Sequence, residues 1–136
     1  MTLSYNIELR QKTRGIHLVT QEIMEQIPEM PETGLLHLFL QHTSAGIGVN
    51  ENADPNVRVD FQAFIDRYIP ENEPYFTHVE EGPDDMPSHI KSAFVGHQIT
   101  LPIRNHKLAL GVWQGIYLFE FRNQGSARRI IATILH

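Results

Sequence analysis

The sequence contains no cysteine. Disulfide bridges and thiolate chemistry are therefore excluded, and any bound metal ion must be held by histidine and carboxylate side chains. Basic residues are also scarce: 11 lysines and arginines stand against 16 aspartates and glutamates, for a formal net charge of −5. Neutralising nucleic-acid phosphates requires a basic surface, so we expect no nucleic-acid partner.

Long hydrophobic runs are missing as well. No apolar stretch approaches the roughly 20 residues that a membrane-spanning helix needs, and the first residues lack the basic and apolar regions of a secretory signal. We therefore expect a cytoplasmic protein without a membrane partner. The 136 residues, 41% of them hydrophobic, fit a single domain over residues 1–136 that buries a substantial core.

The hydrophobic pattern predicts an α+β fold: a single compact domain with a large mixed, mostly antiparallel β-sheet, two main helices and a C-terminal β-meander. We expect the first two strands to form a hairpin. The third strand is apolar at both its odd and its even positions, so we expect both of its faces to be covered. Strands are expected at residues 4–9, 16–19, 34–41, 47–49, 99–103 and 128–135. Residues 108–120 are expected to form one long strand or two strands broken at Gly111 and Gly115. A short helix is expected at 21–27, and the two main helices at 55–69, after the start signal Asp54-Pro55, and at 87–95.

Residues 78–91 concentrate groups that can do chemistry. Two histidines, His78 and His89, flank a Gly-Pro break and a predicted helix start, together with Lys91 and four carboxylates, Glu80, Glu81, Asp84 and Asp85. Imidazole is the commonest metal ligand and titrates near neutrality, which favours a ligand or metal site. Aspartates at a helix start are also ordinary caps, so a capped helix with a solvated acidic rim remains open.

Five motifs together resemble the YjbQ-type family, whose members are described as secondary thiamine-phosphate synthases. The resemblance covers about residues 5 to 135. The motifs are His42-Thr-Ser-Ala-Gly46, Asn50-Glu51-Asn-Ala-Asp54-Pro55, Glu81-Gly-Pro-Asp84-Asp85-Met-Pro-Ser-His89-Ile-Lys91, Gly111-Val-Trp-Gln114-Gly-Ile-Tyr117 and Arg128-Arg129-Ile-Ile131.

The resemblance implies a compact α+β fold, a homotrimer, and polar motif residues gathered in a cleft near the subunit interface. It also implies the joining of hydroxymethylpyrimidine diphosphate to a thiazole phosphate with release of pyrophosphate, as a main or a side reaction. One stretch departs from the family. Many members carry histidines where this chain has Phe121 and Gln124.

Three histidines within the motif regions, His42, His78 and His89, are the candidate metal ligands. Three imidazoles with an open fourth position are typical of a catalytic zinc site. The donor set favours zinc, or magnesium if the substrate is a diphosphate. The same residues also suit an anion or substrate site without a metal.

Carboxylates near these motifs are the candidates for proton transfer, since a closed cleft can raise their pKa toward neutrality. They are Glu51, Asp84 and Glu120. Polar and basic residues that can contact a phosphorylated heterocyclic substrate are Asn50, Lys91, Gln114, Arg122 and Arg129. Two functions remain open: an enzyme acting on that substrate, and a trimeric protein that binds a small anionic metabolite or a metal without turnover.

Overall fold

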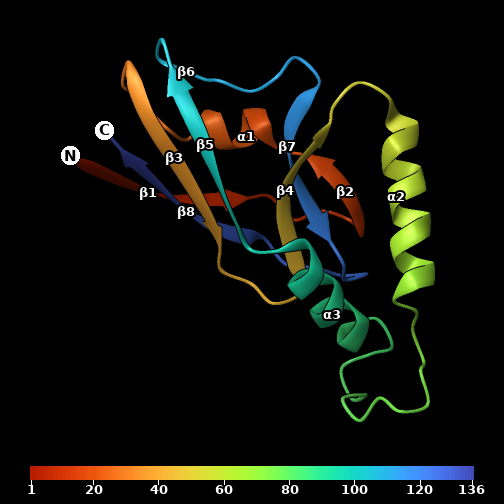
Figure 1. The fold of residues 1–136 in the computed structure, drawn as a ribbon. Helices are drawn as coiled ribbons and strands as arrows, with labels where there is room; N and C mark the ends of the chain where they lie inside the picture. Colours follow the sequence, from red (N-terminus) through yellow and green to blue (C-terminus); the bar gives the residue numbers. More distant parts are fainter.

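The computed structural model describes residues 1–136 as two antiparallel sheets with helices packed against them (Figure 1). The five-stranded sheet has the order β1 (Thr2–Leu9), β8 (Arg128–Leu135), β3 (Thr33–Leu40), β5 (Gln98–Arg104) and β6 (Lys107–Leu108). The three-stranded sheet has the order β2 (Gly15–Leu18), β7 (Gln114–Glu120) and β4 (Ala45–Glu51). The expected α+β class with mostly antiparallel pairing is confirmed.

The main core lies between the two sheets, where 17 buried apolar residues form one cluster. Alternation along β3 sends Leu36, Leu38 and Leu40 into this core, and the short helix α1 (Thr20–Met24) adds Ile23. The opposite side of β3 stays open, because Leu35 and Phe39 are each 43% exposed. The expectation that this strand is covered on both faces is therefore wrong.

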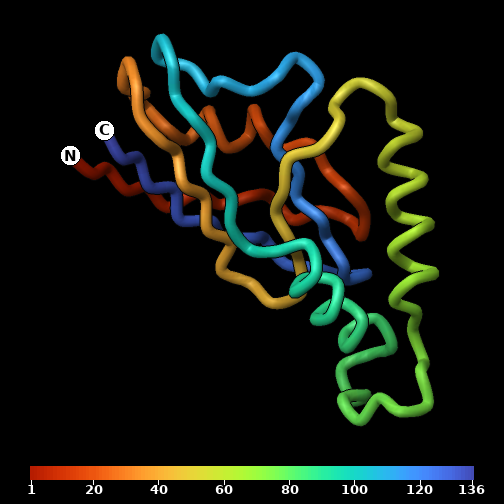
Figure 2. Tube along the Cα trace, viewed as in Figure 1, coloured from red at the N-terminus to blue at the C-terminus, as the bar shows by residue number.

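Helices α2 (Pro55–Tyr68) and α3 (Asp85–Val95) lie on the side of the three-stranded sheet, joined by a long segment that loops away from the sheets (Figures 1 and 2). As predicted, α2 starts at Asp54-Pro55, with the Asp54 side chain accepting the backbone N–H of Asn56. Ile65 packs on Tyr117, Phe119 and Phe121 in a smaller core.

The strand pairing differs from the expected hairpin and meander. β1 pairs with β8, placing Ile7 beside Ile130, and β2 pairs with β7. Of the C-terminal strands only β5 and β6 form a hairpin, whereas β7 joins the three-stranded sheet and β8 enters between β1 and β3. Local alternation identifies a strand and its buried face, but burial against distant strands decides the partner.

The two ends of the chain lie side by side (Figure 1). The Met1 amino group donates a hydrogen bond to the His136 carbonyl oxygen at 2.6 Å. No helix has both the length and the apolar character that crossing a membrane requires.

Candidate functional site

The start of α3 brings together ionisable side chains from three parts of the chain. Asp84 precedes the helix without forming a side-chain cap, and Asp85 opens it. Both carboxylates instead face Arg122, which follows β7. The helix start therefore positions acidic groups for contacts outside the helix, where an ordinary cap would bond to the helix backbone.

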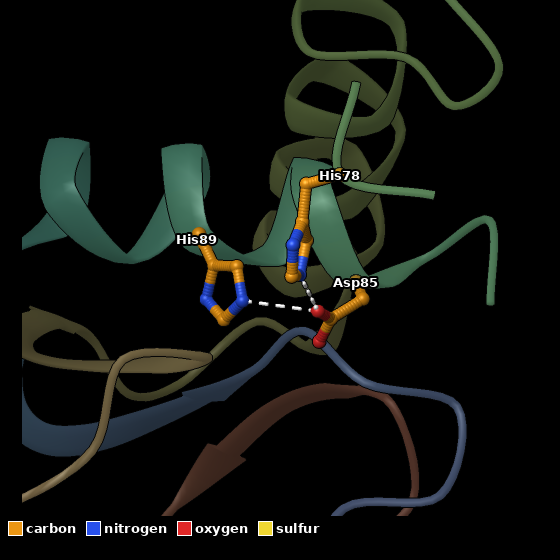
Figure 3. A group of neighbouring side chains, drawn as sticks. All are labelled: His78, Asp85 and His89. Atoms are coloured by element: carbon orange, nitrogen blue, oxygen red, sulfur yellow. Dashed lines mark hydrogen bonds and ion pairs between the residues drawn. The ribbon is translucent and has the colours of Figure 1, made fainter. Parts of the chain in front are cut away.

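Two imidazoles converge on one oxygen of Asp85 (Figure 3). Nε2 of His78 lies 2.6 Å from Oδ2 of Asp85, and Nε2 of His89 lies 3.0 Å from the same oxygen. His89 is four residues after Asp85 on α3, so the two share one face of the helix. His78 reaches the site from the segment that precedes α3.

The second nitrogen of His89 determines which tautomer faces Asp85. Nδ1 lies 2.7 Å from the carbonyl oxygen of Thr43. A carbonyl oxygen only accepts, so Nδ1 carries the proton, and Nε2 of a neutral His89 presents a lone pair to the Asp85 carboxylate. Two acceptors 3.0 Å apart repel each other unless a proton or another cation lies between them.

The same contacts shift the titration of the cluster. The hydrogen bond with Asp85 raises the pKa of His78, and attraction by Asp85 and Glu81 adds to it against a smaller desolvation effect. Burial alone would raise the pKa of Asp85, but the His78 hydrogen bond and the charges of His89 and Arg122 lower it. Asp85 therefore stays ionised near neutrality, and it favours the protonated form of His78.

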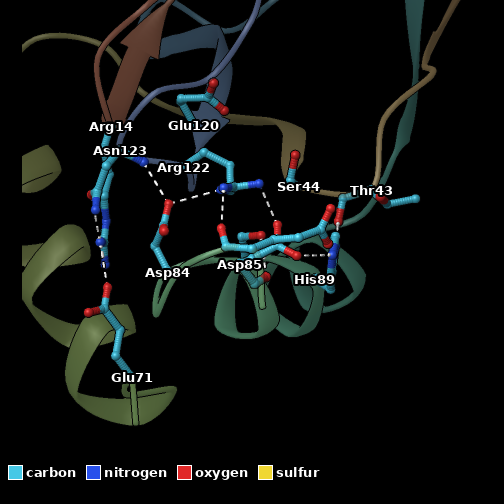
Figure 4. Close-up of polar contacts among 12 residues, drawn as sticks. Arg14, Thr43, Ser44, Glu71, Asp84, Asp85, His89, Glu120, Arg122 and Asn123 are labelled. Carbon is cyan, nitrogen blue, oxygen red and sulfur yellow. Dashed lines mark hydrogen bonds and ion pairs between the residues drawn. The ribbon is translucent and has the colours of Figure 1, made fainter. Parts of the chain in front are cut away.

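Arg122 fixes both aspartates (Figure 4). Its Nε donates to Asp84 at 2.9 Å, Nη1 donates to the second oxygen of Asp85, and Nη2 donates to the Glu81 carbonyl. Burial would raise the pKa of Asp84, but the Asn123 backbone N–H and Arg122 lower it. Asp84 thus stays ionised near neutrality, which is unsuited to donating a proton.

His78, Asp85 and His89 can hold a metal ion. Each offers one ligand atom, and these atoms lie within 4.8 Å of one another. Metal-binding histidines usually donate their other N–H to a carbonyl or carboxylate, as His89 does to Thr43. Two imidazoles and a carboxylate fit zinc better than magnesium, which prefers oxygen ligands.

His42, the third predicted ligand, lies elsewhere. Its Nε2 accepts the backbone N–H of Arg129 at 2.8 Å, so that lone pair is already used. Burial, followed by the charges of Arg128 and Arg129, lowers its pKa. With Arg129 it lines a separate open cleft of about 430 Å³. The structure brings together two of the three predicted ligands.

Glu120 is sealed inside the protein. It is 0% exposed, and its carboxylate accepts hydrogen bonds from Nε and Nη2 of the buried Arg128. Burial raises its pKa, against the opposing effect of Arg128. A Cβ on Gly125 would lie only 1.4 Å from Oε1, so the loop backbone covers the carboxylate directly. No substrate fits between them in this conformation.

The remaining predicted residues do not join the histidine cluster. Lys91 is 1% exposed and donates to Asp66 at 2.7 Å, which ties α3 to α2. Three residues lie at the other end of β4 and β7 and bond to nearby backbone N–H groups: Asn50 to Glu51, Glu51 to Asp54, and Gln114 to Gly111. Their predicted roles in catalysis and substrate binding remain predictions.

Asp85 is the site residue that the sequence-based reasoning passed over in favour of Asp84. Its signal was available, because an acid four residues before a histidine shares its helix face. The contribution of Thr43 had no such signal, since any residue carries a carbonyl group.

Comparison with known proteins places the chain among close relatives. It matches the family described as UPF0047 protein YjbQ-like over residues 5–136. The UPF0047 protein YjbQ of Escherichia coli O157:H7 is 52% identical over 130 residues, which cover 94% of each chain. The UPF0047 protein MJ1081 of Methanocaldococcus jannaschii is 38% identical over 130 residues, 95% of this chain and 89% of that one.

The fold also matches solved structures. The conserved hypothetical protein TT1486 from Thermus thermophilus aligns with a TM-score of 0.82 and 30% identity, covering 97% of this chain and 99% of its own. A YjbQ/UPF0047 protein from Clostridium acetobutylicum aligns with a TM-score of 0.74 and 31% identity, covering 98% and 99%.

Proposed function

The chain belongs to the YjbQ-like UPF0047 family, and on that premise we propose that it is a metal-assisted transferase acting on a small phosphorylated heterocycle. The reaction to test is thiamine-phosphate synthesis. In it, the bond between the pyrimidine methylene carbon and the diphosphate oxygen breaks, and its electron pair leaves with pyrophosphate. The thiazole nitrogen forms the new bond to that carbon.

One observation carries the proposal: His78 and His89 both direct Nε2 at the carboxylate of Asp85. The surroundings hold this arrangement in place, because the Thr43 carbonyl orients His89 and Arg122 binds the other oxygen of Asp85. A site whose supporting groups are already in place loses little entropy when it takes up a cation.

The charge of the site explains why a metal is needed. Three carboxylates, Glu81, Asp84 and Asp85, outnumber Arg122 and His78 even when His78 is protonated, so the bare cluster repels a diphosphate. A bound divalent ion supplies the positive charge that the oxygens of a departing diphosphate require. His78, His89 and Asp85 would hold that ion, and Arg122 would keep Asp85 in place as a ligand.

We also propose that the protein is a cytoplasmic homotrimer. Support for subunit contact comes from the open face of the five-stranded sheet, where Leu35 lies beside Leu135 and Phe39 beside Ile131. Leu35, Phe39 and Leu135 are 43%, 43% and 46% exposed, which is unusual for neighbouring apolar side chains on a free surface. Sedimentation equilibrium measures the subunit number directly.

A binding protein without turnover is the second candidate. The observation in its favour is that Asp84 and Glu120, both predicted to transfer protons, are paired with Arg122 and Arg128. Such a protein would take up the metal and the anionic ligand but form no product.

The first experiment measures metal content by elemental mass spectrometry on tag-free protein. We expect about one equivalent of zinc per chain in the wild type and its loss in His89→Ala. The matched control is His37→Ala, which removes a histidine of β3 whose side chain is hydrogen-bonded to Thr100, away from the cluster. Equal metal content in all three proteins, after resupply of zinc, would refute the site.

The second experiment measures turnover with hydroxymethylpyrimidine diphosphate and thiazole phosphate. We expect thiamine phosphate to form with the wild type and His37→Ala but not with His89→Ala. Metal uptake and ligand binding without product would instead support the binding protein.

A further inference from the structure

A cleft of about 260 Å³ opens beside the histidine cluster. It lies within the segment between α2 and the first turn of α3, and His78 is one of the residues that line it. Pockets for drug-sized ligands measure roughly 300–1,000 Å³, so this cleft is sized for a single small ring.

The walls of the cleft are mainly apolar. Phe76, Val79, Pro83 and Met86 line it, and Phe76 is partly shielded from solvent. An aromatic ring and a thioether suit the faces of a planar ligand, because rings stack on one another and sulfur contacts ring edges favourably. The cleft therefore favours a flat ligand over a branched or sugar-like one.

The polar groups of the cleft set the charge of that ligand. Glu73 and Asn72 line it, and no lysine or arginine does. The nearby ion pairs leave Glu73 without a cation, because Arg14 pairs with Asp66 and Glu71 while Arg122 pairs with Asp84 and Asp85. A free carboxylate repels an anionic ring and attracts ring N–H or amino groups.

We propose that this cleft holds a small planar nitrogen heterocycle, uncharged or cationic, whose phosphorylated arm extends past His78 to the ion held by His78, Asp85 and His89. The inference rests on the proposed function, since it assigns the ring end of the same substrate. Phe76 contacts the face of the ring and Glu73 accepts hydrogen bonds from its edge. These two residues then determine which heterocycle is accepted.

His78 is what joins the two parts of this site. It is one of the residues that line the cleft, and it directs Nε2 at Asp85. The apolar cleft lies on one side of His78 and the proposed metal site on the other. A ligand with a flat, non-anionic end and an anionic end would fit both. Neither a free phosphate nor an isolated ring would use both parts.

The test is isothermal titration calorimetry on zinc-loaded protein with two probes, hydroxymethylpyrimidine diphosphate and inorganic pyrophosphate. Loss of a ring-stacking side chain costs about tenfold in affinity or more. We therefore expect Phe76→Ala to weaken binding of the pyrimidine diphosphate about tenfold and to leave pyrophosphate binding unchanged. Phe64→Ala is the control, because Phe64 is an aromatic residue, 64% exposed, that lies on α2 outside the cleft.

A second variant guards against a folding defect in the first. Glu73→Gln keeps the shape of the side chain, and we expect it to weaken binding of hydroxymethylpyrimidine diphosphate while pyrophosphate binding does not fall. Identical affinities of Phe76→Ala, Glu73→Gln and Phe64→Ala for the pyrimidine diphosphate would overturn the cleft.

A third probe separates failure of the cleft from failure of the metal site. Hydroxymethylpyrimidine without phosphate is titrated at millimolar concentration and followed by ligand-detected NMR. Binding that is lost in Phe76→Ala but kept in His89→Ala supports the cleft even if no metal binds. No binding to the wild type, with pyrophosphate still bound in a zinc-dependent manner, refutes the cleft and leaves the metal site standing.

Discussion

The two ends of the β4–β7 strand pair carry similar polar residues but use them differently. At the end near Ala45 and Glu120, charged side chains from separate elements bond to one another, as Asp85 does with His78 and Arg122. At the other end, roughly 20 Å along β4, the Glu51 and Gln114 side chains bond to backbone N–H groups a few residues away.

The difference separates groups that support the fold from groups that can react. A side chain that satisfies a neighbouring backbone N–H stabilises a turn or a helix start, as Glu51 does before α2. Ionisable groups that face one another shift each other's pKa, as at His78 and Asp85. Such shifts gather at functional sites, so the Asp85 end is the one that we propose to be reactive, and it is called the reactive end below.

The largest expected effect comes from breaking the buried ion pair at the reactive end. Arg128→Met leaves the Glu120 carboxylate without its partner and should lower the free energy of unfolding by about 3–5 kcal/mol. Urea unfolding at constant m-value measures the change. Arg129→Met, on the exposed side of the same strand, should change it by no more than about 0.5 kcal/mol. A similar fall in the free energy of unfolding in both variants would mean that the Glu120–Arg128 pair contributes no more to stability than an exposed arginine does.

The next effect is the pH dependence of zinc affinity, which the reactive end alone should show. Zinc needs neutral imidazoles, and the hydrogen bond with Asp85 raises the pKa of His78. Affinity should therefore rise about tenfold per pH unit for each displaced proton and level off only above the usual histidine value of about 6.5. Competition with a zinc-sensitive dye measures it.

Glu81→Gln sharpens this prediction, because Glu81 helps to raise the pKa of His78. The pH at which zinc affinity stops rising should be lower in Glu81→Gln and unchanged in the control Glu80→Gln. The stability of the metal-free protein should change with pH in the opposite direction to zinc affinity. Protonated His78 contributes fully to the free energy of unfolding below its unfolded pKa, and this contribution is lost as pH rises through the higher folded pKa. If zinc affinity and the stability of the metal-free protein both rose with pH over this range, the role assigned to His78 would be contradicted.

The smallest effect is expected at the other end. Glu51→Ala removes the acceptor of the Asp54 N–H and should cost about 1 kcal/mol of unfolding free energy. Zinc content and turnover should not change. Glu51→Gln keeps an acceptor oxygen and should recover most of the loss. A fall in turnover in Glu51→Gln with normal stability would instead place Glu51 in the chemistry.

Local patterns predicted much of this molecule. The strands expected from alternation are present, except that residues 109–113 are not strand and separate β6 from β7. Helices α2 and α3 lie where their start and stop residues indicated. Long-range relations were not predictable in this way. Phe64, Tyr68 and Phe94 have the helical spacing of core residues, yet they are 64%, 62% and 66% exposed. Their rings lie against one another, Phe64 beside Tyr68 and Tyr68 beside Phe94.

The site shows the same division. Residues 78–91 were expected to hold it, since acids and histidines cluster there in the sequence. The exclusion of His42 was not predictable, because it depends on a backbone N–H of Arg129, 87 residues away. The burial of Lys91 against Asp66 depends likewise on how α2 packs on α3.

The pairing of β1 with β8 determines the order in which this chain can fold during synthesis. β1 is made first, but its only partner is β8, the final strand of the described chain. On the ribosome β1 must therefore wait as an unpaired strand while β3 and β5 can already associate. Completion of the five-stranded sheet must therefore wait for the synthesis of β8, and until then β1 is the segment most exposed to wrong pairing.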